Sequence, residues 1–155
     1  MEGLLAIDPG GSGKGETGIV LFEFDDTTPA TVVRSWAIIN GLEGFLLWLD
    51  DMYESDLAFN HVVCETFVNR NVPGADLTPV LIEGSVRTVF PTEIITLQPA
   101  SGKNSMVSDD VLKKMGVWFT GDHHHDRTEA ARHGLIWFKN RKHIPTLEEM
   151  YDRSN

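Results

Sequence analysis

Three stretches of the sequence place acidic side chains at the ends of apolar segments. Asp8 directly follows Leu-Ala-Ile, and Glu65 directly follows Val-Val-Cys. Asp126 and Glu129 fall in the first turns of a predicted helix, where a spacing of three residues puts both on one face. Because an unpaired buried carboxylate is costly, acids at such positions usually serve a partner or a metal. These four acids are therefore the candidate catalytic residues.

The chemistry that four convergent carboxylates could perform is metal-dependent hydrolysis. Without a cation the four groups would repel one another, and an all-oxygen set suits Mg²⁺, or alternatively Mn²⁺, better than zinc. Two such ions about 3.5–4 Å apart could activate a water and stabilise the leaving oxygen of a phosphodiester. The predicted metal ligands are thus Asp8, Glu65, Asp126 and Glu129.

Each acid also has a structural alternative. Asp8 precedes Pro-Gly and could simply open a turn. Asp126 and Glu129 could complement the positive end of a helix dipole, and for either acid taken alone this is the stronger interpretation. Glu65 is harder to explain structurally, because Glu is disfavoured in strands and almost never buried unpaired. The conjunction of all four favours a site.

These acids must be positioned by the strands and helices of the chain. The order of the predicted elements favours an α/β fold, in which helices flank a mixed sheet. The first three strands are expected to form an antiparallel meander. If the fourth strand is a sheet neighbour of the first, the four acids converge at one site. The predicted strands span 4–7, 17–22, 31–39, 61–65 and 93–98. The predicted helices span 42–55, a stretch from an N-cap at Asp76, a short stretch between Ser108 and Gly116, and 123–140.

Two segments are expected to lack regular structure. Residues 99–108 are small and polar, which predicts a mobile loop, and this loop carries Lys103. Residues 143–155 are expected to form a loose C-terminal tail behind a nuclease domain of residues 1–142. No repeat divides the chain further.

Length and composition favour one soluble domain. The chain has 155 residues, 41% of them hydrophobic and 23% charged, which is ordinary globular composition. Cys64 is the single cysteine, so an intrachain disulfide and a cysteine-based zinc site are both excluded. No apolar run approaches the length of a membrane span, and the first residues lack the basic start of a secretory signal. We therefore expect a cytoplasmic protein with no membrane partner.

The charge is unevenly distributed. The net charge of -10 argues against a nucleic-acid partner, but residues 1–98 carry 4 Lys/Arg against 15 Asp/Glu, whereas residues 99–142 carry 8 against 5. A chain whose positive residues gather in one stretch can present a local basic face to a polyanion. A solvated helix surface explains the same charge pattern equally well.

Four motifs in order resemble a known family. They are Ala6-Ile7-Asp8-Pro9-Gly10, Thr17-Gly18-Ile19-Val20, Val62-Val63-Cys64-Glu65 and Asp126-Arg127-Thr128-Glu129-Ala130-Ala131. Across residues 4–138 they resemble the RuvC-type Holliday junction resolvases of the ribonuclease H-like superfamily, most of all the small phage members. In a phage protein, the compartment would be the host cytoplasm.

The resemblance implies a five-stranded mixed sheet, a divalent metal and paired cuts across a four-way DNA junction by a homodimer. Asp8 and Glu65 match the first two family acids, and Asp126 and Glu129 match the closing pair, with Glu129 where the family usually has Asp. The helix that contains Gly84 is a candidate dimer interface. The candidate DNA contacts are Phe67, Arg70, Lys103, Lys113 and Lys114.

For two of these contacts the residues leave alternatives open. Phe67 follows the second acid by two residues, where the family has an aromatic wedge one position further on, and a core Phe is the stronger interpretation. Lys103 resembles a basic residue near the scissile phosphate, but an exposed loop Lys without a role fits equally well.

Three other features of the sequence are weaker evidence for function. Residues 10–15 resemble a phosphate-binding loop but lack both its first Gly and the Ser or Thr after the Lys, so no nucleotide cofactor is expected. Of the adjacent residues 123–125, all His, one could touch the site. His133 shares the helix face of Asp126 and Glu129 and could orient a carboxylate, although a partly buried structural His is the stronger interpretation.

The sequence therefore predicts a metal-dependent, structure-selective DNA endonuclease, first of all a Holliday junction resolvase. Flap and RNA–DNA hybrid nucleases would use the same acids, since a fold does not fix its substrate. A non-catalytic module that binds junctions or proteins is the alternative from another class, although such a module gains nothing from clustered carboxylates.

Overall fold

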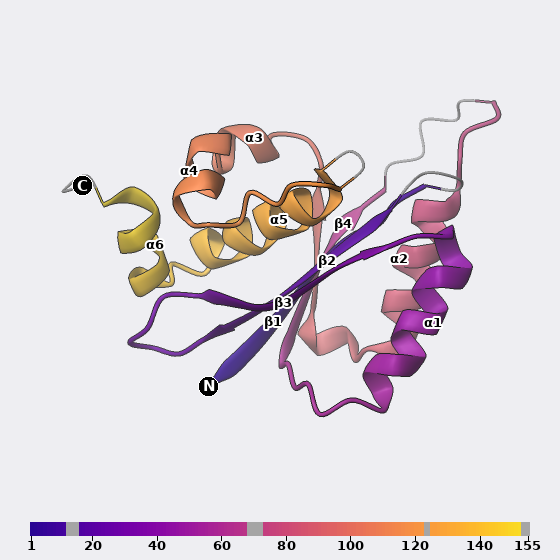
Figure 1. Cartoon of the computed structure of the whole chain (residues 1–155), viewed down its shortest axis with the longest axis horizontal. Coiled ribbons are helices and arrows are strands. Elements are labelled where there is room, and N and C mark those ends of the chain that lie inside the picture. Colours follow the sequence, from indigo (N-terminus) through magenta and orange to yellow (C-terminus); the bar gives the residue numbers. More distant parts are fainter. Residues whose placement is uncertain (12–15, 68–72, 123–124, 153–155) are drawn as a thin grey trace.

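Five strands form one mixed sheet in the order β3-β2-β1-β4-β5 (Figure 1). The computed structural model describes residues 1–11, 16–67, 73–122 and 125–152. The strands are β1 (Glu2–Asp8), β2 (Thr17–Phe24), β3 (Thr31–Ile38), β4 (His61–Thr66) and β5 (Ile95–Pro99). The predicted α/β class and the antiparallel meander of the first three strands are confirmed.

The sheet register places the ends of β1 and β4 next to each other. β1 pairs antiparallel with β2 and parallel with β4, with Ile7 opposite Cys64. Asp8 and Glu65 each follow these paired residues, so both carboxylates emerge at the same end of adjacent parallel strands. The first and fourth strands are therefore sheet neighbours, which is the condition on which convergence of the four acids depends.

Helices cover both faces of the sheet. α1 (Gly41–Tyr53) and α2 (Thr78–Val89) lie on one face, and α5 (Asp126–Asn140) lies on the other with the short helices α3 (Lys103–Met106), α4 (Asp109–Lys114) and α6 (Ile144–Tyr151) (Figure 1). Leu4 and Ala6 of β1 join the core under α5, whereas Leu5 and Ile7 join the core under α1 and α2. A strand covered on both faces has no polar side, which explains its continuous apolar run.

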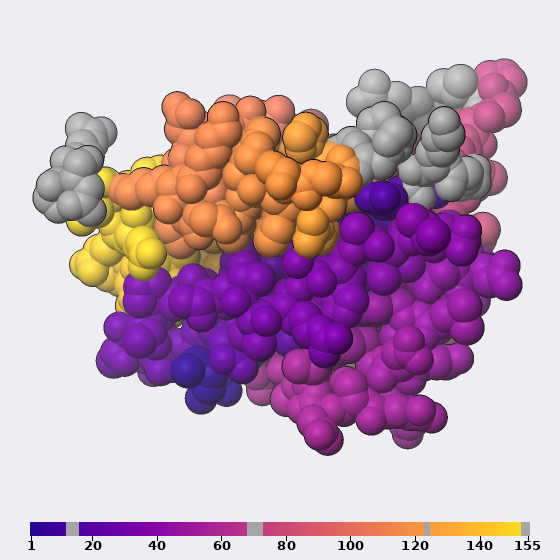
Figure 2. Space-filling model, viewed as in Figure 1, coloured from indigo at the N-terminus to yellow at the C-terminus, as the bar shows by residue number. Residues whose placement is uncertain are grey.

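The N-terminal end of α5 lies directly on the sheet. In the space-filling view, the orange residues around α5 rest on the violet residues of β2 and β3 (Figure 2). Arg127 links the two layers by donating to Oγ of Ser35 in β3 at 3.1 Å. Gly18 in β2, which is paired with Asp8, makes the approach possible, because a Cβ there would lie 2.0 Å from the carbonyl oxygen of Asp126. Glycine thus brings the start of α5 close to the end of β1.

We expect Gly18→Ala to destabilise the protein by about 1–3 kcal/mol, because the new methyl group collides with backbone that can yield only by moving α5. Urea denaturation measures the loss. Gly84→Ala in α2 is the matched control, since its Cβ meets no atom within 4 Å and alanine favours a helix. A Gly18→Ala protein as stable as the wild type would show that the close contact is unimportant.

Three expectations about the elements were wrong. The loop at 99–108 contains α3, and the tail contains α6, whose Thr146 and Met150 are buried against the rest of the molecule. The N-cap residue of α2 is Leu77, although Oδ1 of Asp76 accepts a hydrogen bond from the Thr78 amide. Short helices held by tertiary contacts carry little periodicity, which is why the sequence pattern missed them.

Two element ends also differ. α5 begins at Asp126, after His125 in a left-handed conformation, and the chain before β5 forms a single 3₁₀ turn at Thr92–Ile94. The predicted cap of α4 is confirmed, since Oγ of Ser108 accepts from the Val111 amide.

Within the part of the chain that the structure describes, no helix has the length and apolar character needed to cross a bilayer.

Candidate active site

The four candidate acids come from three elements that meet at one edge of the sheet. Asp8 ends β1, Glu65 lies near the end of β4, and Asp126 and Glu129 lie in the first turn of α5. Burial raises the pKa of Asp8 well above its usual value, the charges of Glu65, Asp126 and Glu129 raise it further, and the charge of Lys103 opposes them. Asp8 therefore lies within electrostatic reach of the other three acids and of Lys103.

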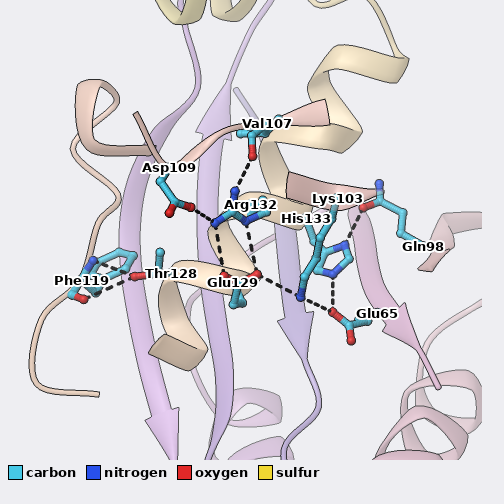
Figure 3. A network of polar contacts seen from close by, with 10 residues as sticks. All are labelled: Glu65, Gln98, Lys103, Val107, Asp109, Phe119, Thr128, Glu129, Arg132 and His133. Carbon is cyan, nitrogen blue, oxygen red and sulfur yellow. Dashed lines mark hydrogen bonds and ion pairs between the residues drawn. The ribbon is translucent and has the colours of Figure 1, made fainter. Parts of the chain in front are cut away.

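Lys103 joins two of these acids. Its Nζ donates to Oε2 of Glu65 at 3.1 Å and lies 2.9 Å from Oε2 of Glu129 (Figure 3). Its side chain is only 19% exposed, so the interpretation of Lys103 as an exposed loop lysine is wrong. Lys103 is the first residue of α3, which turns the chain back over α5 after β5. The helix missed in the sequence thus carries the central cation of the cluster.

His133 holds the other side of Glu65. Its Nε2 lies 2.6 Å from Oε2 of Glu65, and its Nδ1 lies 2.9 Å from Oε1 of Gln98 in β5 (Figure 3). The ring is fully buried, so it cannot leave these partners for water. The carboxylate-orienting alternative for His133 is confirmed, and Gln98 in turn orients the ring.

Arg132 fixes Glu129 from the opposite side. Its Nε and one terminal nitrogen each donate to a different carboxylate oxygen of Glu129, both at 3.3 Å. The same guanidinium also donates to the Val107 carbonyl and to Asp109, and it is only 2% exposed (Figure 3). A buried guanidinium with this many acceptors has one geometry available. Glu129 is therefore tied to the chain between α3 and α4.

The electrostatics divide the acids into two pairs. Burial alone would raise the pKa of Glu65, but the hydrogen bond to His133 and the charge of Lys103 outweigh it and hold the pKa at about 2. For Asp126, burial raises the pKa to about 7, with Glu16 and Asp122 contributing. Oδ2 of Asp126 is buried and has no hydrogen-bond partner among the described residues. Glu65 and Glu129 are thus in direct contact with cations, whereas Asp8 and Asp126 form no ion pair with a described lysine or arginine, and Lys103 acts on Asp8 only through its charge.

The chemistry of these donors fits a hard divalent ion. Four carboxylates supply only oxygen ligands, and the orphaned oxygen of Asp126 is the kind of buried atom that a cation would satisfy. Among residues 1–11, 16–67, 73–122 and 125–152, no three acidic, histidine or cysteine side chains are already arranged around a common ion position. The Lys103 ammonium lies between two of the four acids.

We expect His133→Leu to reduce cleavage about 10–100-fold and to lower the free energy of unfolding by about 1–3 kcal/mol, because Glu65 and Gln98 both lose a buried partner. Single-turnover cleavage at saturating metal and urea denaturation measure the two effects. His61→Leu, in the same strand as Glu65 but paired with Glu2, is the control. Unchanged cleavage by His133→Leu would show that His133 contributes to stability and not to cleavage.

The other predicted DNA contacts are less central. Phe67 is half-buried and belongs to neither core, so its interpretation as a core residue was wrong. Lys113 lies over the Trp118 ring, and Lys114 donates to the Asp152 carbonyl, so both are engaged outside the acidic cluster. Arg70 lies outside the described residues.

The histidine run is mostly outside the description as well. Residues 123 and 124 are not described, and the ring of His125 packs 5.3 Å from that of Trp118.

Three functional neighbours were not predicted. Gln98 holds His133, which contacts Glu65, and Arg132 holds Glu129. Glu83 in α2 accepts hydrogen bonds from the Thr66 hydroxyl at 2.6 Å and from the Phe67 amide at 3.2 Å. Arg132 follows Glu129 by three residues, a spacing that could have indicated the ion pair. For Gln98 and Glu83 no local signal exists, since their partners lie on other elements.

Comparison with known proteins supports the fold assignment. Neither a protein-family model nor a curated protein matches the sequence. Among solved structures, RuvC of T. thermophilus in complex with a Holliday junction substrate superposes with a TM-score of 0.64 at 11% identity, over 90% of this chain and 96% of that one. The fowlpox virus Holliday junction resolvase gives 0.54 at 11% identity, over 90% and 99%. The chain has the ribonuclease H-like fold of these resolvases.

Proposed function

We propose that this protein is a metal-dependent endonuclease that cuts branched DNA, and specifically a Holliday junction resolvase. The observation that carries this proposal is the convergence of four carboxylates from β1, β4 and α5 at one edge of the sheet, with a lysine among them. The shared fold with two resolvases supports the choice of substrate. At 11% identity the fold alone would not assign an activity, so the acid cluster has to carry it.

The acids would hold two Mg²⁺ ions, with Mn²⁺ as the alternative. Bound there, the metal would supply an activated water and would stabilise the leaving oxygen of the phosphodiester. The chain's own groups prepare this site, since His133 orients Glu65 and Arg132 holds Glu129. Lys103 contacts two of these acids, Glu65 and Glu129, and would contact a phosphate oxygen beside the scissile bond.

Binding of DNA by an acidic protein requires local charge. The region of residues 99–142, which supplies Lys103 and Arg132, carries 8 Lys/Arg against 5 Asp/Glu, whereas residues 1–98 have an excess of negative residues. Metal ions would neutralise the acid cluster itself, and Phe67 at the end of β4 would contact an unpaired base. Affinity for DNA should therefore fall steeply as salt is raised.

A homodimer is expected, because symmetric junctions require two active sites. α2 offers a surface for it: Leu77, Val80 and Leu81 are exposed, and Gly84 has open space above its backbone. We expect Leu81→Glu to convert the dimer into a monomer without loss of fold, measured by analytical ultracentrifugation and circular dichroism. A wild type that sediments as a monomer at micromolar concentration would contradict the dimer, and a variant that remains dimeric would exclude this face of α2.

The test is cleavage of a labelled synthetic four-way junction beside flap, RNA–DNA hybrid and linear duplex controls. Paired symmetric nicks that require Mg²⁺ or Mn²⁺ and disappear with chelator support the proposal. If flaps or hybrids are cut preferentially, the proposed metal site stands and the proposed substrate is wrong. Junction binding by folded protein without cutting under any metal condition would overturn the nuclease and favour a binding module.

A further inference from the structure

The Lys103 ammonium contacts two of the four acids that would hold the proposed divalent ions. Glu65 and Glu129 offer it one oxygen each, at 3.1 and 2.9 Å, so one protein cation bridges two of the four proposed metal ligands (Figure 3). Both Glu65 contacts, from Lys103 and from His133, are made to the same oxygen, Oε2. Any ion that binds this oxygen has to compete with the ammonium.

Neither of the remaining two acids forms an ion pair with a described lysine or arginine. Oδ2 of Asp126 is buried without a hydrogen bond among the described residues, and Asp8 is affected by the negative charges of Glu65 and Asp126 as well as by the positive charge of Lys103. Direct contacts to cations are therefore confined to Glu65 and Glu129, and Lys103 acts on Asp8 only through its charge. The site is asymmetric before any metal binds.

We propose that Lys103 is a built-in competitor of the metal, whose ammonium neutralises Glu65 and Glu129 in the metal-free protein and must leave them before they can hold a divalent ion. This inference rests on the proposed metal-dependent function. It predicts two unequal steps, in which an ion first compensates Asp8 and Asp126 and the second ion then displaces the lysine.

The surroundings allow Lys103 to leave while Arg132 stays. Lys103 lies on a helix of four residues that follows Gly102 in a left-handed conformation, and its ammonium ends a flexible four-carbon chain. Arg132 is 2% exposed and is held by the Val107 carbonyl and Asp109 as well as by Glu129. Metal loading would thus release one cation and leave the other to position Glu129. The released ammonium would become available to a DNA phosphate.

The test measures Mn²⁺ binding to the metal-free full-length protein by isothermal titration calorimetry, without DNA. We expect Lys103→Met to bind Mn²⁺ at least tenfold more tightly than the wild type. Lys113→Met is the matched control, because it removes the same charge from a residue that lies over Trp118. Equal affinity of Lys103→Met and wild type, an equal gain in the control, or no binding to any of the three proteins would overturn the proposal.

A second measurement on the wild-type protein does not depend on a variant that folds. Brief acetylation followed by mass spectrometry should show Lys103 modified severalfold faster after addition of Mg²⁺, because the amine has left its two carboxylates. Unchanged protection of Lys103 at saturating Mg²⁺ would overturn the displacement. Since neither measurement uses DNA, both can succeed in a protein that cuts no junction, so failure of the proposed nuclease activity remains distinguishable.

Discussion

Asp8→Asn should lower cleavage of a four-way junction by at least about 10³-fold while junction binding is preserved or strengthened. The carboxylate that ends β1 is flanked by the other three acids, so its replacement by a neutral amide removes a proposed metal ligand. The same change removes one negative charge from the surface that must approach phosphate, which is why binding should not fall. Single-turnover cleavage and a gel-shift titration with chelator measure the two quantities separately.

Stability distinguishes this outcome from simple unfolding. Burial raises the pKa of Asp8 well above its usual value, so the ionised group is a liability in the metal-free fold and the amide should not destabilise it. Glu65→Gln should reduce cleavage similarly, although it also removes the negative charge that Lys103 and His133 contact. Asp110→Asn, an exposed acid on α4, is the control for charge alone. Cleavage by Asp8→Asn within tenfold of the wild type would remove Asp8 from the proposed machinery.

The four acids could be predicted from the sequence because each lies beside a strong local pattern. Asp8 and Glu65 follow buried apolar runs, and a pair of acids three residues apart opens a helix with Ala130, Ala131 and Leu135 on its inner face. The pairing of β1 with β4, which brings the two strand ends together, is a condition that the sequence pattern leaves open. Periodicity and turn residues were sufficient to select the four acids, but not to show that they meet.

The groups that hold the acids in place could not be predicted in the same way. Lys103 lies in a segment without periodicity, and its role depends on α3 folding back over α5. Gln98 meets His133 across a separation of 35 residues. Such contacts arise from the packing of layers, to which local propensity contributes little. The role of Gly18 could be predicted in part, since a glycine within a strand indicates that another segment comes close but does not show which segment it is.

Asp126→Asn should stabilise the metal-free protein by about 2–4 kcal/mol at pH 8 and leave its stability unchanged near pH 4. Burial, with the charges of Glu16 and Asp122, raises the pKa of Asp126 to about 7 from its ordinary 3.8. The stability associated with the protonated acid is therefore fully present below pH 3.8 and is lost as the pH rises through about 7. Asparagine cannot ionise, so the variant keeps that stability across the whole range.

The difference between the two urea unfolding curves, measured from pH 4 to pH 8 with chelator present, isolates this one group from the other acids. Asp110→Asn should follow the wild type at every pH. Addition of Mn²⁺ should then narrow the gap at pH 8, because an ion that binds only the folded state stabilises it by mass action and does so more when Asp126 is ionised. A variant no more stable than the wild type at pH 8 would show that Asp126 is compensated by the protein itself. If Mn²⁺ leaves this difference in unfolding free energy unchanged, Asp126 is not a ligand of the ion. Narrowing of the gap would mean that the carboxylate which costs the metal-free protein stability is the one that the metal needs.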